Sequence, residues 1–124
     1  EPFWIDDVDR VRYHAALTHA SNHLTVLLDQ AAGLLHDIGI EQPRQLLAPL
    51  VHAAVENTLA AGGAALTGPV SRGDAATVES HLAELPQPLQ QPYRVLAAAA
   101  VEIALRNRQI DPAQADRLRE VLGA

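Results

Sequence analysis

The amino-acid sequence predicts an all-α protein, folded as a single helical domain of about five helices with a long first helix. Strong helix formers dominate the composition, and no stretch alternates apolar and polar residues for long enough to form a strand. Most of the 48% hydrophobic content is Ala, Leu and Val, with one Trp, one Phe, two Tyr and no Met. We therefore expect residues 1–124 to form one domain with a core of small side chains between closely packed helices.

Charge and composition exclude several classes of partner. Nine basic residues against fifteen acidic ones give a net charge of -6, which repels phosphate backbones and argues against nucleic acid. No apolar run approaches the roughly 20 residues that span a bilayer. The chain has no Cys, which removes disulfides and thiol chemistry. We expect a soluble, cytoplasmic protein with no membrane partner and, because Glu1 takes the place of an initiator Met, a segment of a longer chain.

The first helix is predicted to run without interruption to about Ile38. Asp6 and Asp7 are suitable N-caps, and Gly39 supplies a left-handed C-cap. Gly33 is a point where the helix can bend, but no Pro interrupts the pattern. Ten residues fall on one broad apolar face, which we expect to lie against the core: Ala16, Leu17, Ala20, Leu24, Leu27, Leu28, Ala31, Leu34, Leu35 and Ile38.

The second helix is predicted to begin at Pro43 and to end at Gly62-Gly63, with a kink at Pro49. Residues 64–73 follow, and their Gly and Pro content predicts an ordered loop instead of a helix.

Three shorter segments complete the predicted fold. Asp74 caps a short helix that reaches Leu85, and the break at residues 86–88 separates it from a fourth helix over residues 90–107. The alanines at 97–100 favour close packing of that fourth helix. The sequence Asp111-Pro112-Ala113-Gln114 contains a capping residue, Pro at the first helical position and Gln three residues after the cap, which predicts a last helix that ends at Gly123.

The first helix also carries a polar stripe beside its apolar face. The stripe comprises His14, Thr18, Ser21, Asn22, Thr25 and Asp29. Most of these groups are uncharged and form hydrogen bonds, which is typical of a partly enclosed cleft, although a plain polar side or a helix-contact seam has the same spacing. His14 suits proton transfer or hydrogen bonding to an anionic substrate, because an imidazole can both donate and accept a proton.

Two further features are weaker indications of a site. His19 and His23 have the i, i+4 spacing that lets two imidazoles share a metal, but the sequence offers no matching acidic or Cys ligand, and we predict no resident metal. Arg72 precedes the helix capped by Asp74, where a cation and free N–H groups can hold an anion; alternatively, Arg72 pairs with Asp74 or caps a neighbouring helix. The glycines match no phosphate or dinucleotide motif, so no cofactor-binding residue is identified.

Taken together, these motifs resemble the C-terminal helical domain of the domain of unknown function 2520 family, a family of Rossmann-like oxidoreductases. The resemblance rests on Tyr13-His14-Ala15-Ala16 with Ala20-Ser21-Asn22, on residues 66–74 (LTGPVSRGD) with Thr77 and His81, and on Pro49-Leu50 and Asn57 between them. It implies a fold similar to the C-terminal domain of 6-phosphogluconate dehydrogenase and an N-terminal Rossmann domain that binds NADP or NAD. This chain alone is expected to bind no cofactor.

The resemblance also implies the roles of particular residues in a homodimer that acts on a small-molecule substrate. Relatives place a Lys one turn before an Asn on the first helix; here Asn22 is present but Thr18 replaces the Lys. His14 is then the candidate for proton transfer and Asn22 orients the substrate, with Thr18, Thr67, Arg72 and Asp74 as substrate-binding candidates. The competing interpretation is a non-enzymatic helical interaction module, and a metal protein using His19 and His23 ranks last.

Overall fold

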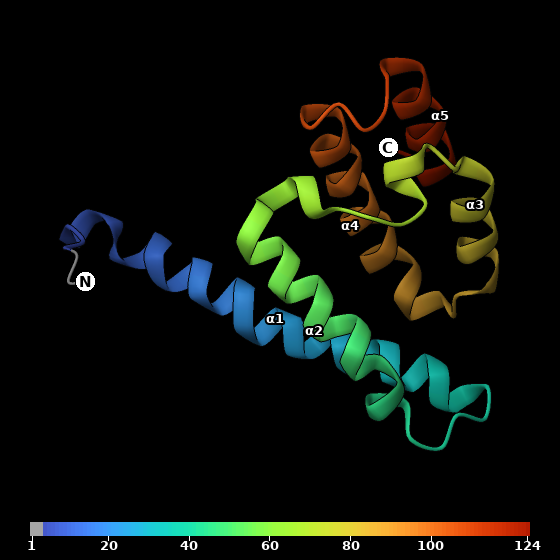
Figure 1. Cartoon of the computed structure of the whole chain (residues 1–124), viewed down its shortest axis with the longest axis horizontal. Helices are drawn as coiled ribbons and strands as arrows, with labels where there is room; N and C mark the ends of the chain where they lie inside the picture. Colours follow the sequence, from blue (N-terminus) through green and yellow to red (C-terminus); the bar gives the residue numbers. More distant parts are fainter. Residues whose placement is uncertain (1–3) are drawn as a thin grey trace. The chain divides into compact units, whose positions relative to one another are not determined.

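The computed structural model describes residues 4–124 and confirms the all-α fold (Figure 1). The first three residues of the predicted domain lie outside the described part, and no strand occurs within it. The elements are η1 (Asp7–Asp9), α1 (Arg10–Asp37), α2 (Pro43–Ala61), η2 (Gly62–Ala65), η3 (Val70–Arg72), α3 (Ala75–Glu84), α4 (Gln87–Arg106) and α5 (Pro112–Leu122), where η denotes a 3₁₀ turn. The chain divides into two compact units, Glu1–Pro49 and Leu50–Ala124, which are described separately.

The first unit consists mainly of α1, which is one uninterrupted helix, as predicted. A 3₁₀ turn precedes it, and an ion pair of 2.9 Å joins the Arg10 Nε to the Asp7 carboxylate. The helix begins at Arg10, later than predicted, because Asp7–Asp9 form this tighter turn. Gly39 follows the C-terminal end with φ at 97°, and the Ile40 N–H donates to the Leu35 carbonyl, so this end is closed as expected.

The prediction that the apolar face of α1 lies in the core is wrong. No residue of α1, all of which is described, is buried. Leu24 and Leu28 are half-buried, and Leu17 and Leu27 are exposed. Amphipathic spacing identifies a face that avoids water but does not identify what covers it, and the buried core lies elsewhere in this chain.

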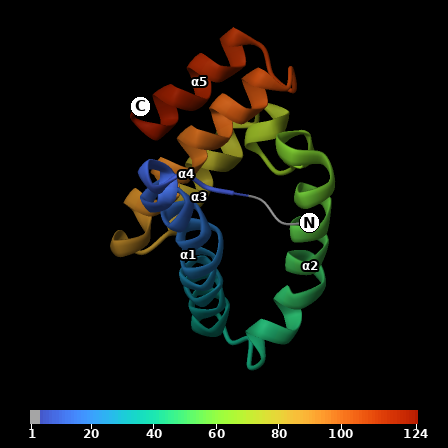
Figure 2. The same ribbon diagram turned by 90° about the vertical axis from the view of Figure 1, so that its left-hand side faces the viewer.

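Among residues 4–124, all of the buried core belongs to the second unit. It consists of Val70, Val78, Leu82, Ala97, Val101, Ala104, Ile110, Ala115, Leu118 and Leu122. These side chains come from η3, α3, α4, α5 and the turn before α5, and α5 packs against both α3 and α4 (Figures 1 and 2). The core contains no aromatic residue, in agreement with the prediction of small side chains, and Ala97 and Ala104 allow the close approach of α4.

The connection between α2 and α3 contains no α-helix, as predicted, but two 3₁₀ turns are built into it. Pro49 lies inside α2, which continues across it to Ala61. Gly63 lies where a Cβ atom would come within 2.9 Å of the Asn107 and Ile103 side chains, so the absence of a side chain lets this turn approach α4.

The helix ends of the second unit follow from local chemistry, with one exception. α5 has the complete predicted capping box, with the Gln114 N–H donating to Asp111 at 2.8 Å and the Asp111 N–H donating to Gln114 at 2.9 Å. By contrast, α4 begins at Gln87, three residues before the predicted start, because Pro88 fits the first turn of a helix. Within the described residues, no helix is both long and apolar enough to cross a membrane.

Candidate functional site

The predicted site residues fall into the two units of the chain. His14, Thr18 and Asn22 lie on α1 in the first unit. Thr67, Arg72 and Asp74 lie between α2 and α3 in the second unit. Each set is therefore described by itself, and the binding of one substrate by both sets stays a prediction.

On α1, hydroxyl groups of the polar stripe bond to the helix that carries them. Ser21 Oγ donates to the Leu17 carbonyl at 2.7 Å and lies 3.1 Å from Asn22 Oδ1, and Thr25 Oγ1 donates to the Ser21 carbonyl at 3.3 Å. Thr18 is half-buried, whereas His14 and Asn22 are exposed. The stripe is thus an ordered but open surface within its unit, and an enclosed cleft would require another surface to cover it.

In the second unit, a tight turn positions Arg72 and Asp74. Ser71 Oγ donates to the Gly68 carbonyl at 2.8 Å, and the Asp74 N–H donates to the Pro69 carbonyl at 2.8 Å. Gly73 adopts the left-handed conformation with φ at 69°, which reverses the chain just before α3. Arg72 and Thr67 remain exposed at this turn.

Asp74 forms the N-cap of α3 through two hydrogen bonds to one residue. Thr77 Oγ1 donates to Asp74 Oδ2 at 2.6 Å, and the Thr77 N–H donates to Oδ1 at 3.1 Å. These two bonds, with smaller contributions from the charges of Arg72 and His81, lower the pKa of Asp74. The carboxylate is therefore ionised at neutral pH and already occupies the Thr77 N–H, which is not available to an external anion.

A hydrogen bond between α3 and α4 extends this group of residues. His81 Nδ1 lies 2.8 Å from the Tyr93 hydroxyl, and the two rings meet edge to face. Tyr93 is half-buried, and this burial raises the pKa of its hydroxyl. His81 is exposed, so the pair joins a solvent-accessible imidazole to the half-buried Tyr93 hydroxyl beside the core. We call Arg72, Asp74, Thr77, His81 and Tyr93 the Asp74 cluster.

The Asp74 cluster provides a cation, a fixed carboxylate, an imidazole and a phenol from one compact unit. Such groups can bind a polar substrate by hydrogen bonds and exchange protons with it. Sequence reasoning included Thr77 and His81 only as part of a motif and did not include Tyr93. The available signal was that Tyr93 is one of two tyrosines in the chain and precedes an alanine-rich helical segment. Its partner lies twelve residues away, which no helical periodicity indicates.

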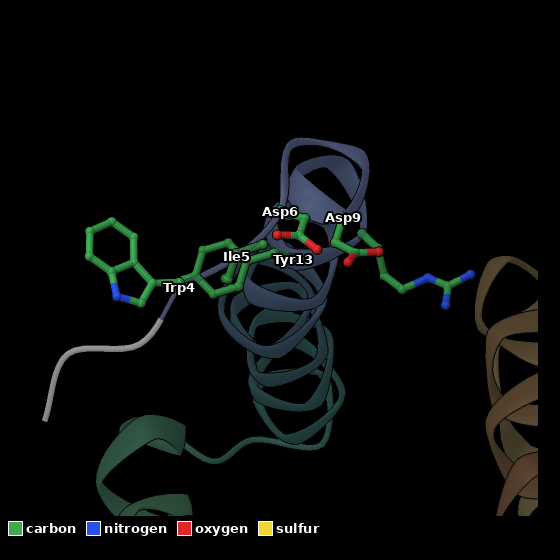
Figure 3. Close-up of a pocket in the computed structure, with 6 residues that line it drawn as sticks. Trp4, Ile5, Asp6, Asp9 and Tyr13 are labelled. Carbon is green, nitrogen blue, oxygen red and sulfur yellow. The ribbon is translucent and has the colours of Figure 1, made fainter.

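Two shallow hollows lie outside these residues. One, of about 350 Å³, lies at the start of α1, where the Trp4 indole extends away from the helix (Figure 3). Asp6 and Asp9, which also line it, belong to the 3₁₀ turn before α1 and its N-cap. Trp4 is 95% exposed, so this hollow is open to solvent. The other, of about 390 Å³, lies between Arg94 of α4 and the C-terminal residues. Neither of these two hollows in the described part of the chain is lined by a predicted site residue.

Comparison with known proteins gives one match. No curated protein and no solved structure matches the chain. A family model, described as the domain of unknown function DUF2520, matches residues 1–100. This range includes α1, α2, α3, the Asp74 cluster and most of α4. Because the match covers well over half of the sequence, in agreement with the motifs on α1 and around Asp74, the chain belongs to the DUF2520 family.

Proposed function

We propose that this chain is the dimerisation and substrate-cleft domain of an NAD(P)-dependent oxidoreductase and is not catalytic alone. The observation that carries the proposal is the contrast between the two ends of the chain. Residues 70–122 contain the whole buried core, whereas the two helices that precede them contain no buried residue among the described positions.

The exposed side chains of α1 and α2 support dimerisation. Large apolar residues that are at least 38% exposed occur along both helices: Val11, Leu17, Val26, Leu27, Leu46, Leu50, Val55 and Leu59. Apolar area removed from water contributes roughly 25 cal/mol per Å², so leaving two helices of this composition uncovered is unfavourable. A second copy presents the same apolar helices and is a chemically matched partner.

Substrate binding is assigned to the polar groups that border these helices. His14 is the proposed proton-transfer residue and Asn22 orients the substrate, with Thr18, Thr67, Arg72 and Asp74 contributing hydrogen bonds. The ordered hydroxyl groups beside Asn22 and the defined turn around Arg72 are consistent with these roles. The substrate is a small polar molecule, since hydrogen-bonding groups prevail among these residues.

Cofactor binding is assigned to another domain. A dinucleotide site needs a strand, a glycine-rich turn and a helix that receives the pyrophosphate, and residues 4–124 contain no strand. The residues present therefore do not fit NADP or NAD, and the proposal places the nicotinamide on a Rossmann domain N-terminal to this chain. That domain supplies the hydride chemistry, and the helical domain closes the substrate side.

The dimer is tested by sedimentation equilibrium of the chain and of Leu27→Asp. The charge at an exposed apolar position of α1 is expected to raise the dimer dissociation constant at least tenfold, because it must be desolvated on association. Thr25→Asp adds the same charge on the polar stripe of the same helix and is the matched control. A monomeric wild-type chain, or equal effects of both substitutions, would contradict the proposed interface.

The oxidoreductase assignment has its own test and a competing interpretation. NADPH and NADH are titrated into this chain and into a form that includes the proposed Rossmann domain; only the longer form is expected to bind. Micromolar binding of either nucleotide by this chain alone would contradict the assignment of the cofactor to another domain. The exposed apolar helices also suit a non-enzymatic interaction module. This alternative predicts that His14→Ala, Asn22→Ala and Arg72→Ala leave the ligand binding and the stability of the longer form unchanged.

A further inference from the structure

His19 and His23 form a side-chain pair on α1 that neither the fold nor the proposed function uses. Their Nδ1 atoms lie 2.6 Å apart, and the rings meet edge to face with centroids 4.9 Å apart. Both residues are exposed and lie well inside the 28-residue helix, one turn apart. The structure adds to the i, i+4 spacing the fact that the two nitrogens already face each other.

We propose that His19 and His23 chelate a divalent late transition-metal ion, with Zn²⁺ as the reference case. One Nδ1 donates a hydrogen bond to the other, so one ring carries its proton on Nδ1. When that ring exchanges with water to carry its proton on Nε2, both neutral rings offer an Nδ1 lone pair to a metal ion. Zn–N bonds of about 2.0–2.1 Å in tetrahedral geometry separate the two nitrogens by about 3.3 Å. Small rotations of two exposed rings provide this opening of less than about 1 Å. Imidazole ligands suit Zn²⁺, Cu²⁺ and Ni²⁺ and disfavour Mg²⁺ and Ca²⁺.

The site is an exchangeable two-ligand chelate. Within the described residues, no group of three His, Cys, Asp or Glu side chains is positioned to hold a metal, so the remaining positions belong to water. The chelate forms only when α1 is helical, since the helix holds the two rings on one face. Metal binding is therefore linked to folding of α1, a helix that has no buried residue of its own.

The test is calorimetric titration of the intact chain with Zn²⁺ in a buffer that does not bind the metal. We expect one ion per chain, with the histidine ring signals of residues 19 and 23 moving in NMR spectra. His19→Asn and His23→Asn should each weaken binding at least tenfold. His36→Asn removes another exposed histidine of the same helix and should leave binding unchanged. Circular dichroism establishes that each variant is helical.

Two results would overturn the proposal. One is the absence of saturable Zn²⁺ binding by a folded wild-type chain. The other is equal binding by the wild type and by either His19→Asn or His23→Asn, which would place the metal elsewhere. Neither result bears on the dimer or the cofactor, which are tested by the separate measurements above.

Discussion

Two independent constraints, backbone conformation and lack of space, favour glycine at position 73. Its φ of 69° is strained for any residue with a side chain, and a Cβ there would lie 2.6 Å from Gln114 Nε2. Gln114 is the residue that completes the capping box of α5. The turn that carries Arg72 and Asp74 therefore lies close to the start of α5, and the missing side chain of Gly73 makes room for Gln114.

Gly73→Ala is expected to cost more stability than Gly68→Ala. Gly68 also has a positive φ, 91°, but among the described residues nothing lies within 4 Å of a Cβ placed there. Backbone strain alone should cost Gly68→Ala about 1 kcal/mol, whereas Gly73→Ala should lose roughly 2–3 kcal/mol because it also displaces the Gln114 side chain. Urea unfolding followed by circular dichroism measures both, and equal losses would show that the Gln114 contact is unimportant.

At the scale of the element, the start of α3 depends on an ionised residue. Asp74 caps the helix with its pKa lowered mainly by the Thr77 hydrogen bonds. The usual pKa of this carboxyl, 3.8, applies to the unfolded chain, and its pKa in the folded chain is lower. The ionised carboxylate therefore stabilises the fold at pH values above 3.8, and this stabilisation is lost as the pH falls through the lower folded pKa. The side chain of Asp111 likewise accepts a backbone N–H, that of Gln114, at the start of α5.

Asp74→Asn removes the charge and keeps one acceptor oxygen for the Thr77 N–H, while an amide NH2 replaces the oxygen that accepts from Thr77 Oγ1. The pH dependence therefore separates the effect of the charge from that of the lost hydrogen bond. The wild type should be more stable than Asp74→Asn at neutral pH, and the difference should shrink as the pH falls through 3.8 toward the lower folded pKa of Asp74. Urea unfolding across this range is the measurement. Glu79→Gln, which removes an exposed carboxyl from the same helix, is the matched control. A difference that is independent of pH would contradict the role of the ionised form.

Across the whole molecule, the buried core and the exposed apolar helices occupy different stretches of sequence. Val101, Ala104 and Leu118 are fully buried in α4 and α5, whereas Leu59 of α2 is 83% exposed. Local unfolding is easiest where few apolar groups are buried. Helices α4 and α5 therefore contain the stable part of the chain, and α1 gains most from a partner.

Amide hydrogen exchange at several protein concentrations is expected to distinguish these parts. The amides of α4 and α5 should exchange slowly at every concentration, since their protection comes from contacts within the chain. Protection of α1 should rise with concentration as the proposed dimer forms, because association stabilises only the covered state. High protection of α1 that does not depend on concentration would argue against dimerisation through this helix.

The sequence by itself determined the helical class and most helix ends. Gly39, Asp74 and the Asp111–Gln114 box act through backbone conformation and hydrogen bonds within one turn, so their consequences are readable locally. Tertiary structure alone decided which apolar residues are buried and which side chains meet across helices. The face of α1 was predicted correctly as apolar and wrongly as core, and the contact of His81 with Tyr93 was not foreseen. Both depend on which helices pack together, and helical periodicity holds no information about the neighbouring surface.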